Sequence, residues 1–141
     1  MNKQIHELSV VELIRGLEDG HFSSVEIVKH YLDRINRYNS ELNAFLYVNE
    51  DAIKQAEKID KEIANGNQKP LLGIPLAVKD NFLTMGMPTT AGSLILKGYY
   101  PQYESTVSKR FLAAGAIILG KTNMDAWAHG SSTETSQYGP T

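Results

Sequence analysis

A lysine directly follows the most apolar run of the chain. Residues 71–78 are almost entirely apolar, and the run ends abruptly in Lys79, Asp80 and Asn81. Ligands gather at the carboxyl ends of parallel strands in open α/β sheets, so this position favours a functional lysine. Partial burial at the rim of a sheet would disfavour the ammonium form and leave a neutral amine that can act as a base. The alternative is a solvated lysine paired with Asp80.

A Gly/Ser-rich turn near the end of the sequence is the second candidate. Gly130, Ser131, Ser132 and Thr133 offer backbone N–H groups and hydroxyls for contact with a small polar substrate. Neither serine lies in a Gly-x-Ser-x-Gly elbow, so the turn by itself does not indicate a nucleophile. An ordinary surface loop is the alternative interpretation.

The remaining polar residues indicate few other kinds of site. Asp125 and His129 are four residues apart and would face each other on a helix, either as an acid–base dyad or as a structural or surface pair. The histidines show no His-x-x-x-His spacing, and we assign no metal site. The glycine spacing matches neither a phosphate-binding P-loop nor a dinucleotide fingerprint. The sequence has no cysteine, which excludes disulfides, zinc–thiolate sites and a cysteine nucleophile.

Composition and charge are those of a folded globular protein. The chain has 141 residues, of which 42% are hydrophobic and 21% are charged. The formal net charge of -2 disfavours direct nucleic-acid binding, because nucleic-acid-binding surfaces are usually basic. The N-terminus is too polar for a secretory signal, and no apolar run approaches the roughly 18 residues of a membrane span. We therefore expect a cytoplasmic protein without a membrane segment.

Capping residues and apolar spacing predict three helices in the first half of the chain. Ser9 with Glu12 and Ser23 with Glu26 have the form of capping boxes, and each precedes apolar residues at helical spacing. Asn49 is expected to cap a third helix. The predicted stops are Gly20, residues 38–40 and Gly66, and a short strand is expected over residues 44–48.

Two apolar runs, 71–78 and 117–119, predict parallel strands that are buried on both faces. A helix over 106–114, capped by Ser105, lies between them and completes half of a β-α-β unit. The stretch 82–101 is too long for a simple connection and indicates a functional or packing loop. Residues 123–129 suggest one or two helical turns. The sequence thus predicts an α/β fold, with N-terminal helices followed by the first part of a mixed, mainly parallel sheet covered by helices.

Five blocks, taken together, resemble the amidase signature family. They are LGIPLAVKDN at 72–81, TTAGS at 89–93, STV at 105–107, AGAIILGKTNMD at 114–125 and GSSTE at 130–134. Their order and spacing are similar to the family's across most of the chain. The resemblance implies an incomplete amidase signature fold, in which 1–141 is the N-terminal portion of a single domain. Residues 1–66 would form its helical N-terminal region, and 71–141 the start of its catalytic α/β core.

The resemblance also implies a chemistry. Members of the family hydrolyse amides with a Ser-Ser-Lys triad, and the lysine of the Val-Lys-Asp-Asn block corresponds to Lys79, which would act as general base and proton relay. The family places both triad serines in segments after the Gly-Pro-Thr turn, which here ends at Thr141. The GSSTE block lines the substrate pocket in the family, so Gly130, Ser131 and Ser132 are expected to bind substrate.

Within the family, the N-terminal helices and the Tyr-Gly-Pro-Thr ending are similar to the glutaminase subunits of tRNA-dependent amidotransferases. This implies hydrolysis of glutamine to supply ammonia within a heterotrimer. Partner subunits would use ATP and Mg²⁺ to activate Glu-tRNA or Asp-tRNA, while this chain would hold no cofactor and would meet tRNA only through its partners. Residues 1–141 alone are expected to be inactive. The alternatives are a stand-alone amidase for another small amide and a non-catalytic α/β scaffold or binding domain.

Overall fold

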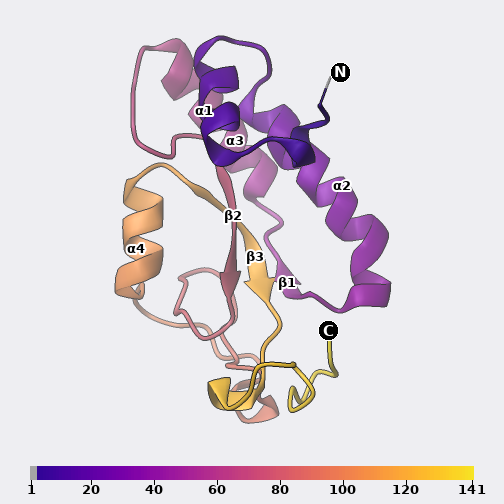
Figure 1. Ribbon diagram of the computed structural model, residues 1–141. Coiled ribbons are helices and arrows are strands. Elements are labelled where there is room, and N and C mark those ends of the chain that lie inside the picture. The colour runs from indigo at the N-terminus through magenta and orange to yellow at the C-terminus, as the bar shows by residue number, and fades with distance from the viewer. Residues whose placement is uncertain (1–2) are drawn as a thin grey trace.

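A computed structural model describes residues 3–141 and shows helices arranged around a three-stranded sheet (Figure 1). The strands β2 and β3 run side by side toward a group of long loops, and α4 lies on the opposite side of the sheet from α2 (Figure 1). This confirms the predicted α/β class. The elements are η1 (Ile5–Glu7), α1 (Val10–Glu18), α2 (Ser24–Leu42), β1 (Phe45–Val48), α3 (Ala52–Ala64), β2 (Pro75–Lys79), η2 (Leu94–Leu96), α4 (Thr106–Ala113), β3 (Ile117–Thr122) and η3 (Ala126–Ala128).

Both predicted capping boxes begin the expected helices. The Ser9 hydroxyl accepts the Glu12 N–H at the start of α1, and the Glu12 carboxylate accepts the Ser9 N–H in return. Ser23 and Glu26 do the same at the start of α2. Each box satisfies two backbone donors that have no partner within the helix, which explains why these helices begin where the sequence predicts.

The predicted cap of α3 is displaced by two residues, although Oδ1 of Asn49 does accept the N–H of Asp51 at 3.1 Å just before the helix. The residue before α3 is Asp51, whose side chain makes no capping hydrogen bond. Asn49 is buried instead, and its side-chain amide donates to the Ile118 carbonyl at 2.8 Å. The backbone N–H of Asn49 donates to the carbonyl of Leu119 at 2.8 Å. Asn49 therefore joins the end of β1 to β3, a long-range contact that a local capping pattern does not reveal.

The sheet has the order β1-β3-β2, with β2 parallel and β1 antiparallel to the central strand. The predicted parallel pair is confirmed, and so is a mixed sheet. β3 extends to Thr122, three residues beyond the predicted apolar run, and is buried almost throughout. β2 begins only at Pro75, because residues 71–74 form turns, and it leaves Ala77 and Lys79 exposed. The prediction of burial on both faces is therefore confirmed for β3 and wrong for β2, which is an edge strand.

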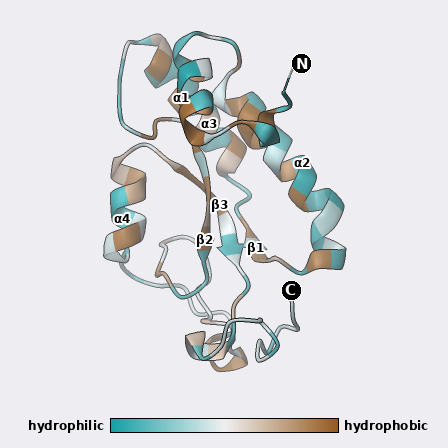
Figure 2. Ribbon diagram, viewed as in Figure 1, coloured by the Kyte–Doolittle hydropathy of each residue, from teal (hydrophilic) through white to brown (hydrophobic). Residues whose placement is uncertain are grey.

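Apolar side chains pack on both faces of the sheet, in clusters of different size. The brown, hydrophobic positions concentrate on the strands and on the inward sides of the helices (Figure 2). None of the helices in residues 3–141 has the combination of length and apolarity that crossing a membrane requires. One packing layer lies between β3 and the helices α2 and α3, and a smaller one lies on the opposite face. The first contains Val28, Ala52, Ala56, Ile117 and Leu119, and the second contains Val78, Met87 and Ile118.

A β-bulge interrupts the pairing of β2 with β3. Leu76 pairs with Ile118, but the next residue, Ala77, pairs with Gly120. Leu119 is therefore an extra residue in β3, and a bulge of this kind changes the face to which the following side chains point. Leu119 itself packs toward α2 and α3.

Because of the bulge, the side chain of Lys121 points to the opposite face of the sheet from the one it would occupy in a regular strand. Lys121 pairs with Val78, whose side chain packs with Ile118 on the smaller core layer. A close approach at Gly120 accompanies this shift, since a Cβ at that position would lie 2.2 Å from the backbone oxygen of Tyr47. Only glycine lets β1 approach β3 this closely here.

We expect Gly120→Ala to destabilise the protein by about 3 kcal/mol, because the added methyl group meets a backbone atom that cannot move without separating β1 from β3. Urea unfolding measures the change. Gly66→Ala is the control, since Gly66 has a positive φ of 79° but a Cβ there would meet nothing within 4 Å. That substitution should cost only about 1 kcal/mol. Equal losses for the two variants would contradict the proposed close approach.

Candidate active site

Lys79 lies at the carboxyl end of β2, opposite Thr122 of β3, as the sequence predicts. Its side chain is exposed rather than partly desolvated, so that expectation is wrong for the chain described here, residues 3–141. The reason is that β2 is an edge strand whose Ala77 and Lys79 positions are uncovered. The alternative of an ion pair with Asp80 is wrong as well, because Asp80 pairs with a different lysine.

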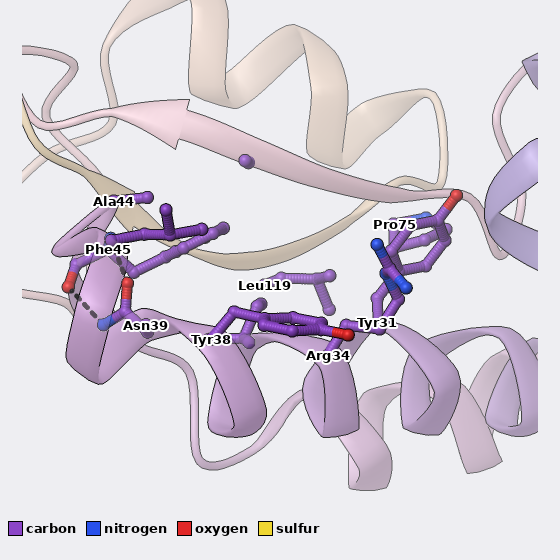
Figure 3. A pocket seen from close by; sticks show the side chains of 11 residues that line it. Tyr31, Arg34, Tyr38, Asn39, Ala44, Phe45, Pro75 and Leu119 are labelled. Atoms are coloured by element: carbon purple, nitrogen blue, oxygen red, sulfur yellow. Dashed lines mark hydrogen bonds between the residues drawn. The ribbon is translucent and has the colours of Figure 1, made fainter. Parts of the chain in front are cut away.

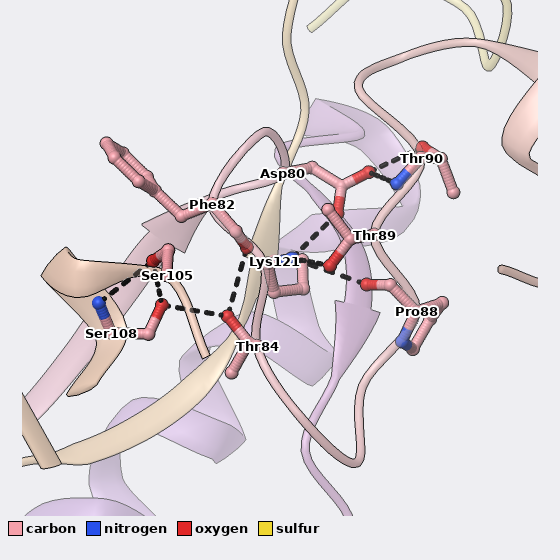
Figure 4. A network of polar contacts seen from close by, with 9 residues as sticks. All are labelled: Asp80, Phe82, Thr84, Pro88, Thr89, Thr90, Ser105, Ser108 and Lys121. Carbon is pink, nitrogen blue, oxygen red and sulfur yellow. Dashed lines mark hydrogen bonds and ion pairs between the residues drawn. The ribbon is translucent and has the colours of Figure 1, made fainter. Parts of the chain in front are cut away.

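That lysine is Lys121. Its Nζ lies 3.1 Å from Oδ1 of Asp80, and the two side chains are 0% and 2% exposed (Figure 4). Burial lowers the pKa of Lys121, because desolvation penalises the ammonium form, and the negative charge of Asp80 opposes that shift. Sequence reasoning overlooked this residue. The available signal was that residues 120–122 end the second apolar run much as residues 79–81 end the first.

The remaining donors and acceptors of the pair are also satisfied. Nζ of Lys121 donates to Oγ1 of Thr89 at 2.7 Å and to the carbonyl of Pro88 at 3.3 Å. Oδ2 of Asp80 accepts the N–H of Thr90 at 2.9 Å and its hydroxyl at 2.5 Å. A buried ion pair is stable only when further hydrogen bonds compensate its charges, and here three consecutive loop residues provide them (Figure 4).

The same loop is tied to the strands through the backbone of Asp80. The Asp80 N–H donates to the carbonyl of Thr122 at 3.1 Å, and its carbonyl accepts the N–H of Ala91 at 3.0 Å. The long segment 82–101 is thus fixed at the carboxyl ends of β2 and β3, directly after Lys79. This is the placement that a functional or packing loop requires.

A second group of hydroxyls ties the beginning of that loop to α4. Oγ1 of Thr84 lies 3.2 Å from Oγ of Ser108, which lies 2.9 Å from Oγ of Ser105 (Figure 4). The Ser105 side chain accepts the N–H of Ser108, which confirms Ser105 as the cap of α4. Ser108 is fully buried, so these contacts hold α4 against the loop.

The Gly/Ser-rich turn folds around a carboxylate. Oδ2 of Asp125 accepts the N–H groups of Ser132 at 3.1 Å and Thr133 at 2.9 Å. Oδ1 accepts the hydroxyl of Thr135 at 2.8 Å. These bonds, that from Thr133 foremost, lower the pKa of Asp125. A Cβ on Gly130 would lie 2.6 Å from the carboxyl carbon, so glycine is needed for the turn to close over Asp125.

The proposed pairing of Asp125 with His129 does not occur in residues 3–141. The expected helical turns shrink to Ala126–Ala128, and Trp127 and Ala128 have positive φ values of 58° and 61°. This kink takes His129 out of helical register with Asp125, whose carboxylate is bonded to the turn instead. Left-handed conformations of non-glycine residues cost energy and cluster at functional sites.

Ala91 links the two candidate sites. Its N–H donates to Asp80, next to Lys79, and its carbonyl accepts the N–H of Trp127 at 2.8 Å, at the start of the segment that leads into the turn. Lys79 and the turn therefore lie at the same end of the sheet. The turn residues Gly130, Ser131 and Ser132 are exposed, and no contact described for residues 3–141 tests their expected role or that of Lys79.

Comparison with known proteins identifies the family. The model of the family described as Amidase matches residues 26–141, which is most of the chain. The chain belongs to the amidase family. The matched segment of this amidase chain includes both candidate sites and the ion pair between Asp80 and Lys121.

Similar amidases fall into two groups. A subunit of the glutamyl-tRNA(Gln) amidotransferase of Prochlorococcus marinus is 53% identical over 132 residues, covering 92% of this chain and 27% of the relative. The subunit of the same name from Hahella chejuensis is 52% identical, covering 94% and 28%. Among solved structures, the native peptide amidase of Stenotrophomonas maltophilia has a TM-score of 0.87 at 35% identity, covering 95% of this chain and 29% of that one. The chain thus spans just over a quarter of these amidases.

We expect Lys121→Met to cost about 4 kcal/mol, because it leaves the buried carboxylate of Asp80 without its counter-charge. The double variant Asp80→Asn/Lys121→Met should lose less than the sum of the two single variants, since it removes both charges. Urea unfolding measures all three. As a control, Lys69→Met removes an ion pair with Glu62 whose side chains are 43% and 39% exposed, and should cost less than about 1 kcal/mol. Additive losses at Asp80 and Lys121 would argue against coupling.

Asp125→Ala should release the turn, because four donors lose their common acceptor. Amide hydrogen exchange at residues 132–135 is expected to accelerate, with little change in β3. The same acceleration should appear at low pH in the parent protein. The lowered pKa of Asp125 means that its contribution is complete above the ordinary value of 3.8 and is lost as the pH falls through the folded value. Unchanged exchange in both cases would contradict the role of the carboxylate.

Proposed function

We propose that this chain is the N-terminal part of the glutaminase subunit of a tRNA-dependent amidotransferase, and that Lys79 is the base of its amide-hydrolysing Ser-Ser-Lys triad. The supporting observation is that this chain is 53% identical to a glutamyl-tRNA(Gln) amidotransferase subunit over 92% of its length. The solved stand-alone amidases are less similar, at 35% for the peptide amidase and 26% for a bacterial aryl acylamidase.

In the proposed reaction, the neutral amine of Lys79 accepts a proton, relayed by one serine, from the hydroxyl of a second serine. That oxygen attacks the side-chain amide carbon of glutamine, and the lysine returns the proton to the leaving nitrogen, which departs as ammonia. Water then hydrolyses the acyl-enzyme to glutamate. Both serines belong to segments outside residues 1–141, so these residues alone are proposed to be inactive.

The network around Asp80 supports the role of Lys79 as a positioned base. Asp80 is held by Lys121, Thr90 and Ala91, so the backbone directly after Lys79 is fixed on both sides. A base must be held within hydrogen-bond reach of its proton donor, and a rigid strand end meets that need better than a mobile loop. Gly130, Ser131 and Ser132 are proposed to contact the glutamine from the same end of the sheet.

The proposed partners are the other subunits of a cytoplasmic heterotrimer. They would use ATP and Mg²⁺ to activate the carboxyl group of Glu-tRNA or Asp-tRNA, which the ammonia then converts to the amide. The net charge of -2 is compatible with this division of labour, because a chain that leaves tRNA to its partners needs no basic face.

A stand-alone amidase is the second candidate, favoured by the TM-score of 0.87 with the peptide amidase. The two candidates differ in substrate and in dependence on partners. Glutamine hydrolysis that requires the partner subunits favours the first candidate. Hydrolysis of peptide or aryl amides by the full-length chain alone, without glutaminase activity, favours the second.

The decisive test of the base is Lys79→Ala in the full-length protein with its partners. We expect turnover of glutamine to fall about 10³-fold, the range of general acid–base catalysis, while thermal unfolding stays unchanged because Lys79 is exposed. Lys97→Ala changes another lysine that is not buried and should leave turnover intact. Near-normal turnover by Lys79→Ala would remove this lysine from the mechanism.

A further inference from the structure

The side-chain amide of Asn43 joins two parts of the chain that are 95 to 97 residues apart in sequence. Asn43 follows α2 in a left-handed conformation, with a φ of 48°. Its Nδ2 lies 3.0 Å from the carbonyl oxygen of Tyr138 and 3.1 Å from those of Gly139 and Pro140. Consecutive carbonyls thus converge on one amide group. Figure 1 accordingly shows the C-terminal end of the chain beside the ends of α2 and β1.

A second amide, that of Asn123, contacts the same segment. Asn123 directly follows β3 and is 8% exposed. Its Nδ2 donates to the carbonyl of Gly139 at 2.9 Å and to that of Asn43 at 3.2 Å. Its Oδ1 accepts the hydroxyl of Ser136 at 2.7 Å. Because its donors and its acceptor are all used, this buried amide is held in one orientation. We call Asn43 and Asn123 together the amide clamp.

The amide clamp also fixes the chain at residue 141. The hydroxyl of Thr141 donates to the carbonyl of Asn43 at 3.2 Å and accepts a hydrogen bond from Nδ2 of Asn123 at 3.2 Å. The backbone N–H of Thr141 donates to Oγ1 of Thr133 at 2.8 Å. Thr133 belongs to the turn that folds around Asp125. Residue 141 is therefore bonded to the end of α2, to the residue after β3 and to the Gly/Ser-rich turn.

Side chains, and not backbone hydrogen bonds, set the path of residues 138–141. These residues belong to no helix or strand. Within residues 3–141, their backbone groups form one backbone-to-backbone hydrogen bond, from the N–H of Gly139 to the carbonyl of Ser136 at 3.2 Å. The left-handed conformation at position 43 is tolerated best by glycine, asparagine and aspartate. Of these three, only asparagine has a side chain that donates to carbonyls at neutral pH, so the residue type fits the clamp.

We propose that Asn43, together with Asn123, is a positioning residue for amide hydrolysis. Its amide sets the path of the chain from the Gly/Ser-rich turn toward the segments that hold the two serines of the triad. This inference rests on the proposed function, which assigns those serines to segments after residue 141 and the base to Lys79. A displacement of about 1 Å between reacting groups can cost about 10²-fold in rate. The clamp keeps the serines at a fixed distance from a lysine on a different part of the chain.

The test uses variants of the full-length protein with its partners. Asn43→Gly removes the amide and keeps the left-handed conformation, which glycine adopts without strain. Asn43→Asp keeps the size but turns acceptors toward the carbonyls. The matched control is Asn39→Ala, one turn earlier in α2. Nδ2 of Asn39 donates to the carbonyl of Phe45 at 2.9 Å and its Oδ1 accepts the Phe45 N–H at 2.7 Å, so this amide ties α2 to β1 (Figure 3).

We expect kcat for glutamine to fall about 10²-fold in Asn43→Gly, and at least as far in Asn43→Asp, because the serines are displaced from their base. KM should change by less than about threefold, since Asp125 holds the proposed substrate-binding turn independently. Amide hydrogen exchange at Gly139 and Thr141 should accelerate, while exchange in β3 stays unchanged. Asn39→Ala should lower the unfolding temperature through two lost hydrogen bonds, with kcat within about twofold of the parent value.

Unchanged exchange at Gly139 and Thr141 in Asn43→Gly would overturn the proposal, because the amide would then not fix the segment. Faster exchange with normal kcat would overturn it as well, since the path of the segment would not matter for the reaction. Equal losses of kcat in Asn43→Gly and Asn39→Ala would indicate a general structural effect and contradict a positioning role. Exchange is measured without turnover, so failure of the clamp is distinguishable from failure of the proposed function, which Lys79→Ala tests.

Discussion

The buried attraction between Asp80 and Lys121 organises the functional end of this structure. Two opposite charges that are buried away from water are stable only if they pair directly and if their remaining donors and acceptors form hydrogen bonds. Those partners are residues 88–90, so the ion pair brings a long loop onto the ends of two parallel strands. From there Ala91 connects the backbone of Asp80 to Trp127 and the last segment of the chain.

Two lysines in similar sequence settings therefore have opposite environments. Lys79 ends an edge strand and is exposed, while Lys121 belongs to the central strand and is buried against Asp80. The bulge at Leu119 and the absence of a side chain at Gly120 turn Lys121 toward the loop. The buried lysine supplies rigidity, because its charge is neutralised by a fixed partner. Within residues 3–141, the exposed lysine forms no ion pair with a carboxylate.

Local signals in the sequence were reliable where the physics is local. Ser9, Ser23 and Ser105 each cap the helix they were expected to cap, since a capping hydrogen bond joins residues only three apart. The same reasoning placed the cap of α3 two residues too early, at Asn49, whose side chain accepts the N–H of Asp51 but also donates to a strand distant in sequence. It also failed at residues 71–74, because a run of apolar residues does not distinguish a strand from a buried turn.

By itself the sequence determined the helices, the α/β class, the placement of Lys79 at a strand end and the family to which its five blocks belong. Tertiary structure alone decided that Lys121 and not Lys79 is buried, and that the Gly/Ser-rich turn encloses Asp125 instead of leaving it to His129. The physical reason is that helix caps and apolar faces depend on neighbours within one or two turns. Burial and charge pairing depend on which strand is central, and strand order is set by contacts between distant parts of the chain.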